Sequence, residues 1–408
     1  MKIGILKETK HPIDNRVILT PDQISELIKN HPEVSFKVQK SDIRAFSDEE
    51  YRAKGIEVAE DISDCDVLMG IKEADISTIL PDKHYIFFGH IAKKQPYNIP
   101  LFKTLLEKNT TFSDYEYLVD EKGLRVIAFG WFAGFAGTYY TLQGWGKCTG
   151  EFELPKPHLK ITAEEMIQNV KDSGLKGVKI VLTGSGRVSH GAQYLLENIG
   201  AVKVSPAEFL KMEARDNVLY TVLPIEEMVA PNDSDSEFSF EDFVKNPQNY
   251  HSIFAPYAKG ADILISCHFW SPGQPVYLTE EAYLEDGFRI KVIGDITCDI
   301  QGSIKSTLDA STHADPFYDY NPRTRKMESP FGDAKNVTVM AVDTCPNALP
   351  RMASESFGDQ FIRNVFKDLV EEDTNPDSIL KKATIIRTGQ LTDEFGYLKE
   401  YVEEFMKK

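Results

Sequence analysis

The sequence predicts an α/β protein of two domains, each a mainly parallel sheet flanked by helices. The chain has 408 residues, which is longer than a single hydrophobic core usually supports. Short apolar runs alternate with helical patterns in two separate series, and this alternation is typical of parallel sheets covered by helices. Hydrophobic residues make up 42% and charged residues 27% of the chain, which favours a globular rather than a disordered protein.

The first series of elements lies in the N-terminal third of the chain. Strands are expected within the apolar runs at 2–7, 34–39, 66–73 and 83–92. A helix is expected over 20–30, in "TPDQISELIKN", where Thr20 can cap the helix and Pro21 occupies its first turn at no cost.

The second series begins at "LKGVKIVLTG" and continues through the runs at 202–206, 261–269 and 289–300. The glycine- and aromatic-rich stretch 126–146 precedes it and allows close helix packing, either at a domain junction or in an ordinary core. The polar, acidic segment 232–250 is interpreted as a surface insertion. We therefore assign 1–138 and 346–408 to a discontinuous first domain and 139–345 to the second.

Charge and cysteine content limit the classes of partner and the compartment. A net charge of −17 at pH 7 disfavours nucleic acids and anionic membranes, so small molecules are the expected partners. The five cysteines form no C-x-x-C pair, which predicts neither a metal site nor a disulfide framework. The N-terminus has no long apolar core and no run long enough to span a membrane is present, so we expect a cytoplasmic protein. The sequence gives no indication of an oligomeric state.

A glycine-rich turn points to a dinucleotide. In "VLTGSGRVSHGAQYLL", Gly184, Gly186 and Ser189 form G-x-G-x-x-S between an apolar strand and an apolar helical pattern. Such a turn lets backbone N–H groups approach a pyrophosphate at the positive end of the helix. This context favours a Rossmann-like second domain over a purely structural turn.

The acid that reads the adenosine ribose is expected at the end of the following strand, in "GAVKVSPAEF". Ser205 occupies the expected tip and Lys203 precedes it, so neither repels a 2′-phosphate. The cofactor is therefore NAD or NADP, and the choice stays open at this point.

Titratable groups follow several strands of the first domain. Lys72 and Glu73 end one apolar run, His90 ends the next, and Glu116 is placed similarly. Because the carboxyl ends of parallel strands face the active crevice of open sheets, these groups are candidates for acid–base chemistry. Three cations, Lys10, Arg16 and Arg125, belong to the same domain, and an arginine fork suits a substrate carboxylate.

Seven stretches, taken together and in this order, resemble the lysine-forming saccharopine dehydrogenase and lysine-ketoglutarate reductase family, within the wider alanine dehydrogenase and transhydrogenase group. They are "KETKHPIDNRVILTP", "GIKE", "FFGH", "RVIAFGWFAGFAG", "TGSGRVSHGAQ", "DITCDIQGSI" and "VDTCPNALPRMASESFG". The resemblance implies reversible, NAD(P)-dependent conversion of saccharopine to L-lysine and 2-oxoglutarate through an imine, in a cleft between the domains.

The resemblance also implies roles for particular residues. Lys72 and His90 would be the catalytic acid–base groups, and Glu73 and Glu116 would tune their pKa values by charge. Substrate carboxylates and the substrate chain would meet Lys10, Arg16, Arg125 and Phe135. The cofactor would be held by Gly184, Gly186, Arg187, Ser189 and Asp343, with Lys203 and Ser205 near the ribose.

Two other functions fit parts of the sequence. An alanine dehydrogenase-like enzyme would use a similar lysine and histidine on a smaller substrate. A non-catalytic dinucleotide-binding regulator would share the fold but would not need Lys72 and His90.

Overall fold

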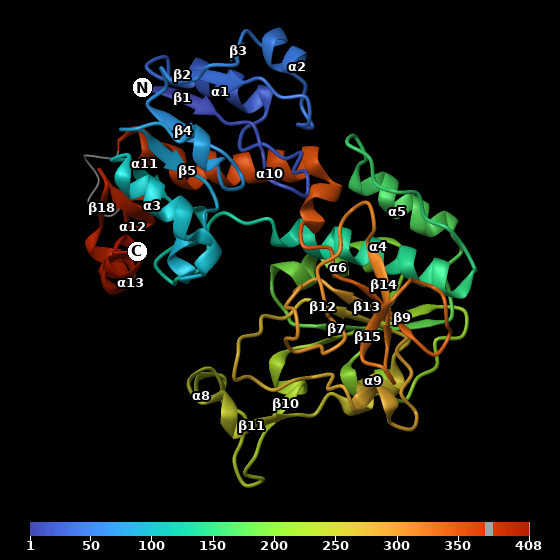
Figure 1. The fold of residues 1–408 in the computed structure, drawn as a ribbon. Coiled ribbons are helices and arrows are strands. Elements are labelled where there is room, and N and C mark those ends of the chain that lie inside the picture. Colours follow the sequence, from blue (N-terminus) through green and yellow to red (C-terminus); the bar gives the residue numbers. More distant parts are fainter. Residues whose placement is uncertain (372–377, 408) are drawn as a thin grey trace. The chain divides into compact units, whose positions relative to one another are not determined.

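The computed structural model describes residues 1–371 and 378–407 and divides into two compact units (Figure 1). The first unit comprises Met1–Phe129 and Pro350–Lys408, and the second comprises Gly130–Leu349. Each contains one eight-stranded, mostly parallel sheet flanked by helices, which confirms the predicted α/β class. The contacts divide the chain at 129/130 and 349/350 rather than at 138/139 and 345/346, so the glycine-rich helix belongs whole to the second unit.

The sheet of the first unit has the order β18-β17-β6-β5-β4-β1-β2-β3. Strands β1 to β6 are mutually parallel, whereas β17 and β18 are antiparallel additions from the C-terminal segment. The strands are β1 (Lys2–Ile5), β2 (Ser35–Gln39), β3 (Glu57–Ala59), β4 (Val67–Met69), β5 (His84–Ile86), β6 (Thr111–Ser113), β17 (Thr384–Arg387) and β18 (Gln390–Leu391).

The helices of the first unit come from both chain segments. They are α1 (Pro21–Asn30), α2 (Asp48–Ala53), α3 (Ile99–Glu107), α10 (Pro350–Phe361), α11 (Lys367–Val370), α12 (Ile379–Lys382) and α13 (Lys399–Met406). A π-helical segment, Ile362–Phe366, joins α10 to α11, and short 3-10 turns cover Ile76–Thr78, Ile91–Lys93, Pro96–Asn98, Tyr115–Tyr117 and Asp393–Leu398. Both labelled chain ends in Figure 1 lie in this unit.

Local sequence signals explain where α1 begins. The Thr20 hydroxyl accepts a hydrogen bond from the Gln23 backbone N–H, and the Gln23 side chain accepts one from the Thr20 N–H. Pro21 is the first helical residue. This reciprocal cap satisfies two N–H groups that have no partner within the helix. The cap by Thr20 was predicted, whereas the return bond from the Gln23 side chain was not.

The sheet of the second unit has the order β15-β14-β16-β13-β12-β7-β9-β8. Six strands are parallel, and β14 and β15 are antiparallel at one edge. The strands are β7 (Val178–Thr183), β8 (Val202–Lys203), β9 (Val218–Leu223), β12 (Ile263–Ser266), β13 (Val292–Asp295), β14 (Phe317–Asn321), β15 (Lys326–Glu328) and β16 (Val337–Met340). Every residue of β7 is buried, as expected for a central parallel strand.

The helices of the second unit are α4 (Gly130–Thr149), α5 (Ala163–Asp172), α6 (Arg187–Asn198), α7 (Pro206–Phe209), α8 (Phe240–Lys245) and α9 (Ala255–Gly260). Short 3-10 turns cover Ile225–Glu227, Pro247–Asn249, Ala282–Leu284 and Cys345–Ala348. Helix α4 packs closely on α6, because a Cβ at Gly134 would lie 1.7 Å from the Val188 carbonyl oxygen. The glycines of the 126–146 stretch therefore serve core packing within the second unit.

The acidic segment forms an arm, defined here as Val229–Ser252. Strands β10 (Val229–Pro231) and β11 (Tyr250–Ser252) pair with each other and not with the large sheet, and α8 lies between them in sequence (Figure 1). Rings of Phe238, Phe243 and Tyr250 pack together, with centroids 5.3 to 6.3 Å apart. Phe243 and Tyr250 belong to the hydrophobic core of the second unit, so these rings join the arm to that core.

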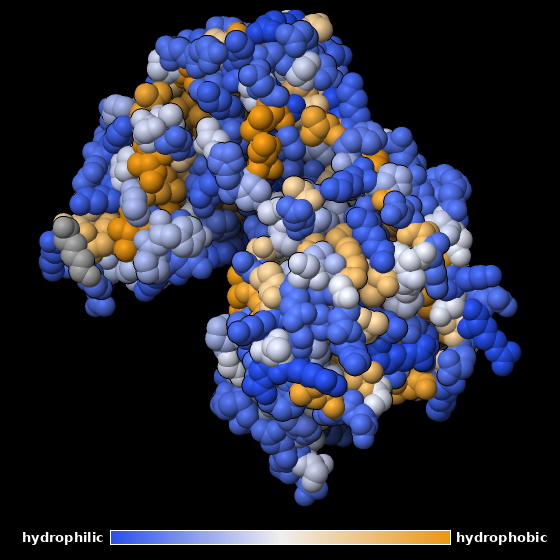
Figure 2. Space-filling model, turned by 45° about the vertical axis from the view of Figure 1, so that its right-hand side comes forward, coloured by the Kyte–Doolittle hydropathy of each residue, from blue (hydrophilic) through white to orange (hydrophobic). Residues whose placement is uncertain are grey.

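The molecular surface is largely hydrophilic in one view (Figure 2). Figure 2 shows a mostly hydrophilic face in which hydrophobic residues form separate patches. Within residues 1–371 and 378–407, no helix has both the length and the apolar character needed to cross a membrane.

Candidate active site and cofactor pocket

The predicted acid–base residues follow the carboxyl ends of neighbouring parallel strands. Lys72 and Glu73 follow β4, His90 follows β5, and Glu116 follows β6. These three strands are consecutive in the sheet of the first unit, and their registers are aligned. The fold therefore gathers groups that are far apart in sequence at one edge of the sheet.

Glu116 is the centre of a group of cations. Its carboxylate lies 3.2 Å from His90 Nδ1 and 3.0 Å from Lys93 Nζ, and it also accepts a hydrogen bond from Arg125. Burial alone would raise the pKa of Glu116, but the His90 hydrogen bond and the charges of Lys93 and Arg125 lower it to about 2. Glu116 is thus a fixed negative charge beside the His90 ring.

The contact with Glu116 determines how His90 can act. A carboxylate accepts a hydrogen bond from protonated Nδ1, so the neutral ring carries its lone pair on Nε2. The His90 side chain is 26% exposed, and its ring stacks beside that of Phe88 with centroids 6.1 Å apart. His90 therefore has the geometry of a general base or acid that is partly open to solvent.

Asp114, which the sequence did not point to, holds the backbone around His90 and Glu116. It accepts hydrogen bonds from the backbone N–H groups of Gly89, His90 and Glu116, at 3.1, 2.9 and 2.9 Å. Burial raises the pKa of the Asp114 carboxyl. His90 has a left-handed backbone with φ +52°, an uncommon conformation for a non-glycine residue, and the Asp114 hydrogen bonds help to fix it.

Glu8 plays the corresponding part for Lys72. Its carboxyl accepts hydrogen bonds from the backbone N–H groups of Ile71 at 2.6 Å and Lys72 at 2.9 Å. Burial, followed by the charge of Asp14, raises the pKa of Glu8 to about 8. Glu8 lies within the quoted motif "KETKHP", but nothing in the sequence shows that it faces β4.

Arg16 is already paired with a carboxylate of the chain. Its Nε and Nη2 atoms donate to the two oxygens of Asp14 at 2.9 and 2.5 Å, and its guanidinium lies 4.2 Å from the Phe129 ring centroid. Burial raises the pKa of Asp14, but Arg16 more than offsets this, so the net shift is downward. Arg16 is buried, and a substrate carboxylate would have to share it with Asp14.

Lys10 and Glu73 line a small cavity of about 250 Å³ in the first unit. The Lys10 ammonium lies 3.4 Å from the Glu73 carboxylate, which is almost fully buried. Asn98 lines the same cavity and donates a hydrogen bond to the His90 carbonyl oxygen at 3.1 Å. The cavity wall is therefore linked directly to the segment that carries His90.

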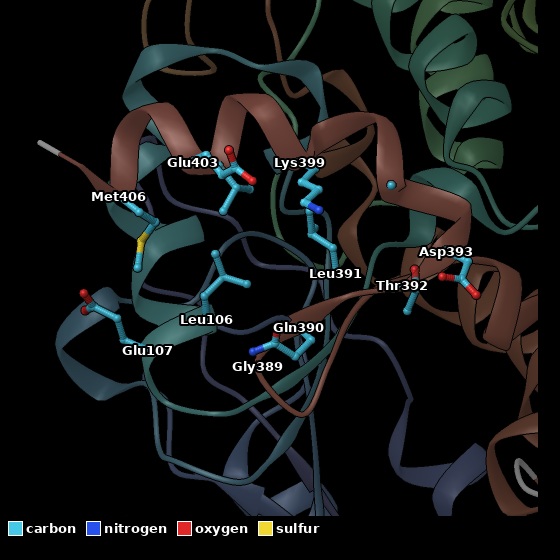
Figure 3. Close-up of a pocket in the computed structure, with 12 residues that line it drawn as sticks. Leu106, Glu107, Gly389, Gln390, Leu391, Thr392, Asp393, Lys399, Glu403 and Met406 are labelled. Carbon is cyan, nitrogen blue, oxygen red and sulfur yellow. The ribbon is translucent and has the colours of Figure 1, made fainter.

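A larger cavity in the first unit, of about 570 Å³, involves none of the predicted site residues. Figure 3 shows its lining from the end of α3, the β17–β18 turn and α13, with Glu107, Lys399 and Glu403 around it. Its larger size does not make it the better candidate, because the acid–base groups are elsewhere.

Phe135 was expected to pack beside the substrate chain, and this role stays a prediction. It lies in α4 of the second unit, has no exposed surface, and stacks on Trp131 with ring centroids 5.3 Å apart. The glycine-rich helix uses this aromatic ring for packing, which the sequence pattern could not distinguish from a substrate contact.

The predicted cofactor turn lies between β7 and α6. Gly184 has φ +83°, and a Cβ there would lie 2.8 Å from the His268 Cα, so only glycine fits without strain. Gly186 precedes the first residue of α6, and no atom lies within 4 Å of a Cβ built on it. Ser189 is buried in α6 and accepts a hydrogen bond from Gln193, so its role is helix packing. The backbone here can approach a pyrophosphate closely, as a dinucleotide requires.

A cavity of about 790 Å³ opens onto this turn. Gly184, Gly186 and Arg187 line one part of it, and Phe240 and Val244 of the arm line another. The volume lies within the usual range of small-molecule and cofactor sites. The residues present therefore fit a dinucleotide in size and in backbone geometry.

Lys203 and Ser205 are not at this cavity. Lys203 ends the outermost strand β8 and Ser205 follows it; β9 separates β8 from β7, and neither residue lines the cavity. The Ser205 hydroxyl caps α7 through Glu208, and Lys203 donates to Gln193 at 2.8 Å. The ribose-binding acid was expected after the strand that follows the glycine turn, but β9, which was not among the expected strands, lies between that strand and β7.

Asp343 follows β16 and is exposed, close to the thiols of Cys298 and Cys345. It is at the carboxyl end of a parallel strand, as expected of a residue near a bound cofactor. Among the residues that the structure describes, no three His, Cys, Asp or Glu side chains form a group suited to a metal ion.

The chain is similar to known proteins over most of its length. Residues 4–136 match the family described as "Alanine dehydrogenase/PNT, N-terminal domain". "Alpha-aminoadipic semialdehyde synthase" of Arabidopsis thaliana is 29% identical over 97% of this chain, and the mitochondrial protein of that name from Rattus norvegicus is 27% identical over 98%. The chain spans only 41% and 48% of the length of these two relatives.

A relative of similar length is "Saccharopine dehydrogenase [NAD(+), L-lysine-forming]" of Neurospora crassa, which is 25% identical over 87% of this chain and 88% of its own. Among solved structures, an L-alanine dehydrogenase has a TM-score of 0.63 at 18% identity, covering 98% of this chain and 100% of its own. A transhydrogenase from Sinorhizobium meliloti has a TM-score of 0.58 at 17% identity, covering 96% and 99%. These two structures share the fold.

Proposed function

We propose that this chain is a dinucleotide-dependent oxidoreductase that interconverts saccharopine with L-lysine and 2-oxoglutarate, because residues 4–136 match the alanine dehydrogenase/PNT N-terminal domain family. The names of the relatives that cover most of the chain motivate this substrate. The observation that carries the proposal is the His90–Glu116 pair, followed along the sheet by Lys72 at the end of the adjacent strand.

Saccharopine is a secondary amine that joins two amino-acid skeletons. Its oxidation to an imine and the hydrolysis of that imine each move a proton, so two acid–base groups are useful. A bound nicotinamide would accept the hydride from the carbon next to nitrogen, and Gly184, Gly186 and Arg187 would hold its pyrophosphate. The remaining chemistry belongs to residues of the first unit.

Lys72 takes the proton from the substrate nitrogen during oxidation. His90 Nε2 then removes a proton from water as the oxygen bonds to the imine carbon, and it later returns a proton to the departing lysine nitrogen. Glu116 stabilises the imidazolium that forms between these steps, because its carboxylate stays ionised 3.2 Å from Nδ1.

The positive charges near this site suit a substrate with several carboxylates. Lys10 and Arg125 are both about half exposed, and each already contacts one acidic side chain. A substrate carboxylate can reach the exposed part of each side chain. Arg16 is buried beside Asp14, and in this proposal it orders the loop after β1 rather than binding substrate alone.

The test compares two pairs of substrates. Purified protein is incubated with NADH or NADPH, and oxidation is followed with lysine plus 2-oxoglutarate and, separately, with ammonia plus pyruvate. We expect oxidation with the first pair and saccharopine as the product, identified by mass spectrometry. Oxidation only with ammonia and pyruvate would replace the proposal by an alanine dehydrogenase-like activity. Nucleotide binding with no oxidation of either pair would favour a regulator.

A further inference from the structure

The strand order of the second unit shows that a ribose-binding acid is expected after β9 rather than after β8. Strand β9, not β8, is hydrogen-bonded to β7, in parallel and with Thr183 opposite Leu223. The Gly184 N–H donates to the Leu223 carbonyl oxygen at 2.8 Å, which joins the glycine turn to the end of β9. The residues that follow β9 are therefore the neighbours of the turn, although they come about forty residues after it in the sequence.

Glu226 is the acid at this position. It lies in the short turn Ile225–Glu227 directly after β9 and lines the same cavity as Gly184 and Gly186. The carboxylate is exposed, and within the described residues no hydrogen bond or ion pair engages it. The adjacent Glu227 differs, because it accepts a hydrogen bond from the Tyr257 hydroxyl at 3.3 Å and does not line the cavity.

Few of the residues that line the cavity are charged, so the carboxylate of Glu226 is a distinctive feature of the lining. Of the described residues that line the cavity, Arg187 is the only Lys or Arg and Glu226 is the only Asp or Glu. His268 also lines it, but burial lowers the pKa of His268 to about 3, so its ring is neutral. Arg187 is the first residue of α6 and belongs to the phosphate turn, which leaves Glu226 as the charged group at the end of β9.

The apolar part of the same lining offers flat surfaces for an adenine ring. Phe240 of α8 and Phe269 after β12 line the cavity and are 63% and 81% exposed. Such exposure is unusual for large aromatic side chains, and a flat base would cover them. Ile225, next to Glu226, lines the cavity as well.

We propose that Glu226 binds the adenosine ribose hydroxyls and makes the site selective for NAD(H) over NADP(H). A carboxylate accepts hydrogen bonds from the two ribose hydroxyls and repels a 2′-phosphate. This inference rests on the proposed dinucleotide site of the second unit but not on the identity of the substrate.

The experiment measures the dissociation constants of NADH and NADPH for the purified full chain by isothermal titration calorimetry. We expect the wild type to bind NADH more tightly than NADPH. Glu226→Gln should weaken NADH binding by about 10- to 100-fold, the usual effect of losing a hydrogen bond to a charged group, and should narrow the difference between the two nucleotides. Glu226→Arg should favour NADPH.

Glu227→Gln is the matched control, because it removes a neighbouring charge outside the cavity and should leave the ratio of the two constants unchanged. The proposal is overturned if the wild type prefers NADPH, if Glu226→Gln keeps the wild-type ratio, or if neither nucleotide binds. A clear NADH preference that depends on Glu226, together with no oxidation in the presence of lysine and 2-oxoglutarate, would support this inference and reject the proposed substrate.

Discussion

Three carboxyl groups of the first unit shape the candidate site in different ways. Glu116 stays ionised because cations surround it, whereas burial raises the pKa values of Glu8 and Asp114. Glu8 and Asp114 accept backbone hydrogen bonds and so set the positions of Lys72 and His90 rather than reacting themselves. Residues of the same chemical type thus differ in role because their surroundings differ.

The charge of Glu116 predicts a particular pH dependence of stability. Its pKa is about 2 in the folded protein against an ordinary value of 4.5, so its ionised form stabilises the fold above about pH 4.5. That contribution is lost as the pH falls from about 4.5 towards 2. Urea unfolding of the wild type and Glu116→Gln should therefore give a difference in free energy that shrinks on acidification.

Glu121→Gln is the control for this measurement, because Glu121 is an exposed glutamate close by in the chain. The unfolding free energies of Glu121→Gln and the wild type should differ little over the whole pH range. A difference for Glu116→Gln that does not change between about pH 6 and 3 would show that the ion pairs do not hold the Glu116 carboxylate as described.

Short stretches of sequence predicted those features that depend on interactions between residues close together in the chain. Thr20, Pro21 and Gln23 set the start of α1, and the glycine turn followed by a helical pattern identified β7 and α6. The partners of the site residues were not visible in this way. Asp114 and Glu8 act through contacts between strands, and these depend on strand order rather than on neighbours in the sequence.

The two glycines of the turn are predicted to respond differently to alanine. Gly184→Ala places a Cβ on a backbone with φ +83°, 2.8 Å from the His268 Cα, and should destabilise the protein by about 1–3 kcal/mol. Gly186→Ala has an ordinary φ of −87° and no atom within 4 Å of the added Cβ. Its unfolding free energy should change by at most about 0.5 kcal/mol.

Nucleotide binding is a second measurement that tests the role of Gly186 in the turn. The Cβ of Gly186→Ala projects where the backbone would approach a pyrophosphate, so NADH should bind more weakly although the fold is intact. Urea unfolding and calorimetric titration of both variants check the prediction. Unfolding free energies that fall equally for both, or NADH binding that is unchanged by Gly186→Ala, would argue against a phosphate-binding turn.

For the whole molecule, the alternation of strands and helices predicted the α/β class with two mainly parallel sheets, and the structure confirms it. The order of the strands was not predicted, because the run that forms β9 was not among the expected strands and strand pairing depends on contacts between distant segments. The ribose-binding acid was therefore expected after β8, near Lys203 and Ser205, rather than after β9, at Glu226. An aromatic residue in a glycine-rich stretch suits packing and binding equally well, so the role of Phe135 beside the substrate stays a prediction.

The most direct test of the account is the rate of NADH oxidation with saturating lysine and 2-oxoglutarate in Lys72→Met and His90→Asn, measured together with the NADH dissociation constant. We expect each variant to lose at least about 100-fold in turnover, the usual contribution of an acid–base group, while NADH binds as in the wild type. Lys83→Met, at the opposite end of β5, should retain full turnover. Wild-type turnover in either Lys72→Met or His90→Asn would contradict the assignment of these two residues as the proton carriers.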